Sequence, residues 1–169
     1  FVNFYYNGTD IYNDVSVNYC VHEMFAEKQA DTLVIRFNDT KGTGSKWHPA
    51  EGDTVQFKEG ASDTGKMFVH SMKPENGLFT IRAMSMPKTA KIRKSKSWEG
   101  VRFLQLANEF AGNHGLTFKN YGCEDQVYPY IKQSNEGDFS LFSRLCMLEG
   151  CQMLIFDGSL LAYNEHYIE

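Results

Sequence analysis

The sequence predicts an α+β fold in which an N-terminal antiparallel β-barrel is followed by a small α+β domain with two helices and a β-hairpin. Two observations lead to this prediction. Up to about Pro87, short runs of alternating apolar and polar residues are separated by Gly, Asn, Asp and Pro, which is typical of half-buried strands. From Trp98 onward, the apolar residues recur with the 3.6-residue period of a helix.

The first predicted domain, residues 1–87, consists of strand-like runs joined by turn signals. Asn7-Gly8 is a strong hairpin signal after the first run, and Pro74-Glu75-Asn76-Gly77 joins the last two. Such short antiparallel strands suit a small barrel or sandwich, which manages its edges by closing or by pairing with a neighbour. The runs cover residues 1–6, 15–21, 32–37, 54–58, 66–70 and 78–83, with a further segment around Ile11.

A basic run, residues 88–97, separates the two predicted domains. It follows Pro87 and contains few apolar residues. We interpret it as a solvated linker, and the alternative is a contact with an acidic partner surface. Its cations are Lys88, Lys91, Arg93, Lys94 and Lys96.

The second predicted domain, residues 98–169, opens with a helix from Trp98. Val101, Leu104 and Phe110 belong to its apolar face. Ser97 is placed to cap the start of this helix. We expect the helix to end near His114-Gly115, where Gly supplies the left-handed cap.

A second helical pattern contains Phe139 and extends to Leu148. Ser134 or Asn135 is its candidate cap, and Gly150 is its stop signal. Two apolar runs then flank Asp157-Gly158, which is among the best short hairpin signals. This half of the chain is therefore predicted to contain two helices and a hairpin.

The composition is that of a folded, mildly acidic protein. Of 169 residues, 42% are apolar and 22% are charged, which suffices for one substantial core or two small ones. The formal net charge of −4 leaves no basic footprint, so we expect no specific nucleic-acid binding. We also expect the protein to be made in the cytosol and not to insert into a membrane. No apolar stretch approaches the about 18 residues that span a bilayer, and no signal peptide is evident.

The sequence supports no catalytic, cofactor-binding or metal-binding assignment. Its histidines offer candidate bases but nothing pairs them with a nucleophile, and His114 is better explained by the dipole at a helix end. Asp14, Glu124 and Asp125 are isolated acids on predicted loops, and residues 42–46 lack the spacing of a phosphate loop. We therefore expect a protein that is not an enzyme and carries no cofactor. The histidines are His22, His48, His70, His114 and His166.

The four cysteines form no Cys-x-x-Cys pair. We interpret them as free thiols that pack as small apolar groups, rather than as metal ligands or disulfides. They are Cys20, Cys123, Cys146 and Cys151.

Several segments resemble a known family. Ala30-Asp31-Thr32-Leu33, followed by Trp47-x-Pro49-x-Glu51-Gly52-Asp53-x-Val55, is similar to the first barrel of the phage tail hub proteins of the late control protein D family. Lys94–Gly100 leading to His114-Gly115-Leu116, and Gln133–Phe139 before the Asp157-Gly158 hairpin, resemble the segments after that barrel. The resemblance covers the chain from about Ala30 to Tyr163, departs at Gly137, and ends before the family's second barrel.

The resemblance implies a structural component of a phage or prophage tail baseplate, located in the virion tail. It implies a hub or adaptor that joins the tail tube to the spike, acts without catalysis and is related to the type VI secretion spike protein. The expected partners are further copies of the chain, as a homotrimer, together with tail tube, spike and baseplate proteins. Ring assembly would also protect exposed strand edges.

A second interpretation stays open at this point. Several tyrosines alternate with polar neighbours, and such tyrosines fill β cores or mark a protein or sugar interface. They include Tyr5, Tyr6, Tyr12, Tyr19, Tyr128 and Tyr130. The alternative is therefore a β-rich receptor- or carbohydrate-binding module of a phage or cell-surface protein. The two predicted helices favour the hub, because a sugar-binding β domain has no evident need for them.

Overall fold

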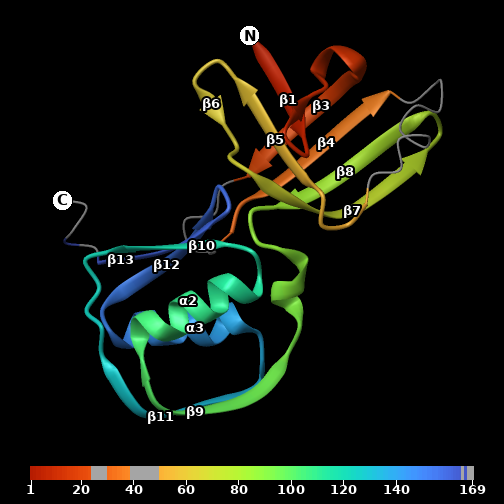
Figure 1. Ribbon diagram of the computed structural model, residues 1–169. Coiled ribbons are helices and arrows are strands. Elements are labelled where there is room, and N and C mark those ends of the chain that lie inside the picture. The colour runs from red at the N-terminus through yellow and green to blue at the C-terminus, as the bar shows by residue number, and fades with distance from the viewer. Residues whose placement is uncertain (24–29, 39–49, 165, 167–169) are drawn as a thin grey trace. The chain divides into compact units, whose positions relative to one another are not determined.

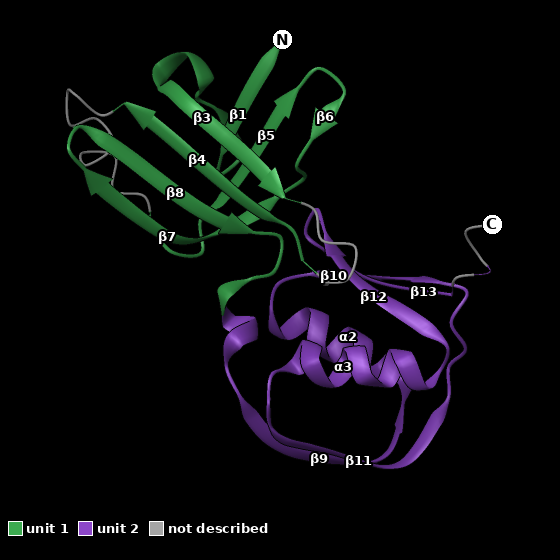
Figure 2. Cartoon of the chain, turned by 180° about the vertical axis from the view of Figure 1, so that it is seen from behind, with its two compact units in different colours: residues 1–88 green, residues 89–169 purple. Residues whose placement is uncertain are grey.

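The computed structural model describes residues 1–23, 30–38, 50–164 and 166 (Figure 1). The chain divides into two compact units, Phe1–Lys88 and Thr89–Glu169, here called unit 1 and unit 2 (Figure 2). Each unit has its own buried apolar core, and each is described by itself. None of the described helices is both long and apolar enough to cross a membrane.

Unit 1 is a single antiparallel sheet in the strand order β2-β1-β5-β7-β8-β4-β3, with β6 paired to β5. Two hairpins turn at the predicted signals, since Asn7 and Gly8, like Asn76 and Gly77, have positive φ angles. The strands are β1 (Val2–Tyr6), β2 (Thr9–Asp10), β3 (Ser16–Glu23), β4 (Thr32–Asn38), β5 (Thr54–Glu59), β6 (Ser62–Asp63), β7 (Met67–Glu75) and β8 (Leu78–Met84), with a 3-10 turn at Tyr12–Asp14.

The sheet of unit 1 is open among the described residues. β3 pairs only with β4, and no described pairing joins it to β1 or β2 at the other end of the sheet. The β-rich character predicted for this part of the chain is confirmed, whereas closure into the expected barrel is not confirmed, because the described strands form an open sheet. One edge of the sheet is the eight-residue strand β3.

The core of unit 1 lies on one face of this sheet. Phe37 and Phe79 stack there with ring centroids 5.3 Å apart. The predicted alternation fails in β3, because a register shift between Val17 and Tyr19 moves the side chains that follow it to the opposite faces. The buried residues are Phe4, Tyr6, Leu33, Ile35, Phe37, Val55, Met67, Val69, Phe79, Ile81 and Ala83.

Unit 2 combines a three-stranded sheet, two helices and a two-stranded ribbon. The sheet has the order β10-β13-β12, in which β10 runs parallel to β13, and the ribbon pairs β9 with β11. The helices lie between sheet and ribbon (Figure 1). The elements are a 3-10 turn (Lys88–Lys91), β9 (Lys94–Arg102), α2 (Phe103–Asn113), β10 (Thr117–Tyr121), β11 (Val127–Glu136), α3 (Asp138–Leu148), β12 (Cys151–Phe156) and β13 (Ser159–Asn164).

Aromatic contacts hold these layers together. Phe103 of α2 and Phe142 of α3 stack at 5.2 Å, and Phe118 of β10 meets the Phe142 ring edge-on at 6.1 Å. Trp98 of β9 packs edge-on against Phe110 of α2 at 5.7 Å. The core of unit 2 therefore forms where both faces of the helix pair are covered.

The predicted basic linker, residues 88–97, is wrong over its second half. Lys94 and Lys96 belong to β9, so α2 begins at Phe103 and not near Trp98. The sequence pattern misplaced this helix because β9 is stabilised by its antiparallel partner β11, which the sequence analysis did not predict. Ser97 does not cap the helix, and its hydroxyl instead bonds the hydroxyl of Tyr130 at 3.1 Å.

The start of α3 also differs from its prediction, whereas the ends of both helices agree with theirs. Ser134 and Asn135 lie in β11, and the cap position before α3 is Gly137. Gly115 and Gly150 have φ angles of 69° and 70°, which confirms the predicted left-handed stops. The hairpin at Asp157-Gly158, with φ angles of 51° and 73°, is confirmed as well.

Candidate functional site

A buried polar cluster in unit 2 centres on Asp138, the first residue of α3. Its side chain is 2% exposed. Gly137 brings the start of α3 close to the chain that enters β9, because a Cβ at this position would lie 2.7 Å from the carbonyl oxygen of Ala90. The position thus requires glycine through close approach and not through a positive φ, since φ is −73°.

His114 lies next to Asp138 and uses both of its ring nitrogens. Its Nε2 is 2.9 Å from Oδ2 of Asp138, and its Nδ1 is 2.7 Å from Oγ1 of Thr89. The imidazole is 3% exposed and tilts against the ring of Phe139. His114 occupies the cap position at the end of α2, as its sequence position predicted, but it also forms a buried bond that the sequence did not reveal.

Three further donors reach Asp138. Lys94 Nζ and Asn113 Nδ2 approach Oδ2 at 3.2 and 3.4 Å, and Gln133 Nε2 donates to Oδ1 at 2.9 Å. Burial alone would raise the pKa of the carboxyl. The hydrogen bonds from His114, Gln133 and Lys94, with the charge of Lys94, outweigh burial and hold the pKa of Asp138 well below its usual range.

The order Thr89 hydroxyl, His114 imidazole and Asp138 carboxylate matches the functional groups of a nucleophile, a base and an orienting acid. Here the Asp138 carboxylate also contacts Lys94, and the His114 imidazole is buried away from any substrate in solution. The hydrogen bonds of His114 therefore connect elements of the fold. The cluster ties the segment before β9 to β9, β11 and both helices. We therefore describe it as a packing cluster and assign no catalytic role to it.

The remaining histidines do not join this cluster. Nε2 of His22 lies 3.3 Å from Asp31 in unit 1, and His70 is buried with Nε2 2.6 Å from the carbonyl oxygen of Met86. His166 is exposed, while His48 and residues 42–46 lie outside the described residues.

Three of the four cysteines gather in unit 2. Cys123, Cys146 and Cys151 are buried, Cys20 of unit 1 is partly buried, and all four are free, as predicted. Burial, followed by a side-chain hydrogen bond with Cys151, raises the pKa of Cys123 to about 12. Within the described ranges, no group of three or more His, Cys, Asp or Glu side chains is arranged to hold a metal ion.

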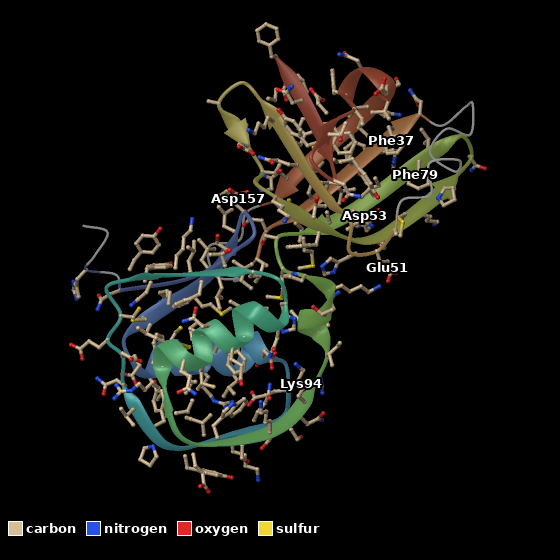
Figure 3. All side chains as sticks on the ribbon, in the orientation of Figure 1. Phe37, Glu51, Asp53, Phe79, Lys94 and Asp157 are labelled. Atoms are coloured by element: carbon tan, nitrogen blue, oxygen red, sulfur yellow. The ribbon has the colours of Figure 1, made fainter. Side chains whose placement is uncertain are left out.

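The basic run is largely paired within the chain. Lys88 lies 2.7 Å from Glu51, Lys94 contacts Asp138, and Lys96 contacts Glu109 at 3.3 Å. Figure 3 labels Glu51 and Lys94 on their separate elements. Lys91 and Arg93 are the two cations of the run for which the described residues offer no ion-pair partner.

Two surfaces expose apolar side chains. Tyr19 and Val21 project from the edge strand β3, because of the register shift in that strand. At the end of α3, the side chains of Met147 and Leu148 are each 72% exposed. Contiguous exposed apolar groups mark protein or membrane contacts or ligand grooves.

No protein-family model matches the chain, and no curated protein matches it. Solved structures do match it. The 43 kDa tail protein of prophage MuSo2 from Shewanella oneidensis has a TM-score of 0.69 at 13% identity, over 96% of this chain and 53% of that protein.

Two further tail proteins have the same fold. The tail protein from Neisseria meningitidis MC58 matches with a TM-score of 0.65 at 11% identity, over 95% of this chain and 49% of that one. The prophage tail protein gp18 from Listeria monocytogenes EGD-e matches with a TM-score of 0.56 at 12% identity, over 89% of this chain and 44% of that one. The chain thus spans about half the length of these proteins. Its fold is one found in prophage tail proteins, and the finer resemblance to the hub family stays a prediction.

Proposed function

We propose that the chain is a structural component of a phage or prophage tail. In this role it acts as a hub or adaptor at the baseplate, joins the tail tube to the spike by oligomeric assembly, and catalyses no reaction. The observation that carries the proposal is the tail-protein fold, which extends over 96% of the chain in the Shewanella match and includes both units. Fold alone does not fix function, so the assembly itself has to be tested.

The open sheet of unit 1 supports an assembly role. An edge strand presents unpaired backbone donors and acceptors, which a strand from another subunit can satisfy. β3 is such an edge among the described residues, and Tyr19 and Val21 add exposed apolar groups to it. A protein that works by packing into a ring has a use for these features that an isolated domain lacks.

Co-sedimentation with tail tubes tests this proposal. The chain, with any residues that follow Glu169 in its gene, is mixed with polymerised tail tube protein from the same genome. We expect it to sediment with the tubes and to saturate at a ratio set by tube ends. The variant Val21→Lys tests the β3 edge, because it places a charge there. It is expected to weaken tube binding while the circular dichroism stays unchanged.

Absence of binding to tube ends at every concentration would contradict the adaptor role. Binding to immobilised glycans or to host cell surfaces, without tube binding, would instead support a receptor- or carbohydrate-binding module. The mass in solution adds a second readout, since we expect the adaptor to form homotrimers.

A further inference from the structure

Lys91, Ile92 and Arg93 form a basic and apolar surface on unit 2, here called the 91–93 surface. Lys91 is the last residue of the 3-10 turn Lys88–Lys91, and Ile92 and Arg93 follow it. Ile92 is 56% exposed, and both cations are exposed without an acidic partner among the described residues. Lys91 and Arg93 are thus the cations of the basic run that form no ion pair with another described residue.

A second surface, here called the α3-end surface, has the complementary chemistry. Met147 and Leu148 of α3 supply its apolar part. Glu149 supplies a carboxylate at the end of α3, and the exposed Glu124 supplies another from the segment that leads to β11, whose second residue, Tyr128, bonds Glu149; neither carboxylate forms an ion pair with a described cation. The surface is therefore apolar and acidic.

Hydrogen bonds fix the α3-end surface in place. The Tyr128 hydroxyl donates to Glu149 at 2.8 Å and so ties the start of β11 to the end of α3. The Phe103 N–H donates to the carbonyl oxygen of Gln126 at 2.9 Å, and the Leu104 N–H donates to Asp125 at 2.9 Å. A surface ordered before binding loses less conformational entropy on association.

The two surfaces lie at opposite ends of α3. At its start, a Cβ on Gly137 would lie within 4 Å of the carbonyl oxygens of Ala90 and Ile92. At its end are Met147 and Leu148. An eleven-residue helix is about 16 Å long at 1.5 Å per residue. One copy of unit 2 thus offers a basic surface at one end and an acidic surface at the other.

We propose that the 91–93 surface of one copy docks on the α3-end surface of a second copy. Ile92 meets the apolar side chains of Met147 and Leu148, while Lys91 and Arg93 face the carboxylates of Glu124 and Glu149. Contacts between different surfaces are heterologous, so every bound copy keeps one surface free and a ring can close. The inference rests on the proposed tail function, for which it supplies the contact within the ring.

Paired variants test the contact by sedimentation velocity. We expect Lys91→Glu with Arg93→Glu, and separately Met147→Asp with Leu148→Asp, to weaken self-association at least about tenfold. The first pair places like charges together, and the second replaces the apolar side chains that Ile92 meets by hydrated carboxylates. The control Lys119→Glu with Lys132→Glu makes the same charge change on exposed lysines elsewhere in unit 2 and is expected to leave association unchanged. High salt should weaken the wild-type contact.

Mixing the two defective variants gives a sharper test. The Met147→Asp/Leu148→Asp copy retains its 91–93 surface, and the Lys91→Glu/Arg93→Glu copy retains its α3-end surface. A head-to-tail contact therefore predicts a one-to-one heterodimer in the mixture, although each variant alone is monomeric. Circular dichroism of each variant shows whether it has folded.

Two results would overturn the inference. One is a wild-type chain that stays monomeric at every concentration reached, and the other is a set of folded variants that associate as the wild type does. Tube binding separates these failures from failure of the proposed function. If the wild type binds tubes and the variants self-associate as it does, the tail function stands and the contact between copies lies elsewhere. If the wild type binds no tubes, the proposed function fails whether or not the chain self-associates.

Discussion

The Asp138 carboxylate accepts hydrogen bonds from four side chains that come from different parts of unit 2. Such a buried charge is tolerated because its partners replace the water it loses. Lys94 and His114 come from segments on either side of α2. At the scale of single residues, this cluster fixes where the chain entering β9 meets the two helices.

Replacing Asp138 by Asn should lower the free energy of unfolding at neutral pH by about 3 kcal/mol, because buried donors lose their charged acceptor. The folded pKa of Asp138 lies below the unfolded value of about 3.9. Its contribution is therefore present above about pH 4 and is lost as the pH falls below that value. Urea unfolding should show a smaller difference between wild type and variant at low pH. Glu99→Gln, at an exposed strand position, is the control, and an equal difference at both pH values would contradict the prediction.

Gly137 and Gly112 form a matched pair for substitution. A Cβ on Gly137 would meet the Ala90 carbonyl oxygen at 2.7 Å, whereas one on Gly112, within α2, meets nothing within 4 Å. We expect Gly137→Ala to destabilise the fold by about 1 to 3 kcal/mol. Gly112→Ala should stabilise it by about 0.5 to 1 kcal/mol, since alanine is the better helix former. Thermal melts compare the two, and equal shifts would mean that the close approach to Ala90 is absent.

The cysteines should be unreactive in the native protein. Burial, with a smaller effect of the Glu59 charge, raises the pKa of Cys20 to about 11, and that of Cys123 is about 12. Little of either thiol is therefore ionised at mildly alkaline pH, and the thiolate is the reactive form. A colorimetric disulfide reagent should react slowly with the native chain and with all four thiols in denaturant. Rapid stoichiometric labelling of the native chain would contradict this.

At the scale of elements, the start of α2 depends on a distant segment. Its first N–H groups bond to Gln126 and Asp125, and not to a residue just before the helix. A carboxylate at this end also interacts favourably with the helix dipole. The cap therefore forms only when the segment before β11 has reached its place.

Asp125→Ala should destabilise the protein by about 0.5 to 2 kcal/mol, because the Leu104 N–H loses its acceptor. Asp125→Asn keeps a hydrogen-bond acceptor and should retain part of this stability. The neighbouring substitution Glu124→Ala, at an exposed position that caps no helix, is the control. Urea titrations at low protein concentration measure all three, and an equal loss for Asp125→Ala and Glu124→Ala would exclude the cap.

At the scale of the whole molecule, two separate cores support the fold. Phe37 and Phe79 stack in unit 1, whereas Phe142 contacts Phe103, Phe110 and Phe118 in unit 2. A segment of the chain that has its own core usually unfolds as one cooperative unit. The two units are therefore expected to respond separately to damage.

Phe142→Ala should cost unit 2 about 3 to 5 kcal/mol, because it removes a buried ring from three aromatic contacts. Hydrogen exchange measured by mass spectrometry should then rise in peptides of unit 2 and stay unchanged in β4 and β8. Phe79→Ala is the converse variant and should affect unit 1 alone. Loss of protection throughout the chain in either variant would mean that the units unfold together.

The features that depend on neighbouring residues alone were predictable from the amino-acid sequence. Asn7-Gly8, Asp157-Gly158, Gly115 and Gly150 all adopt the backbone that their residue types favour, because a turn is set within a few residues. The β-rich first half, the presence of two helices and the resemblance to tail proteins also followed from local patterns. The shared fold supports the last of these at the level of prophage tail proteins.

Features that need partners distant in the chain became apparent only in the folded molecule. β9 replaces the predicted linker because β11 pairs with it, and β10 is a strand because it lies parallel to β13. The open sheet, the shifted register in β3 and the cluster around Asp138 likewise join residues far apart in the sequence. Pairing and burial across such distances outweigh local propensity, so no local sequence pattern could predict these features.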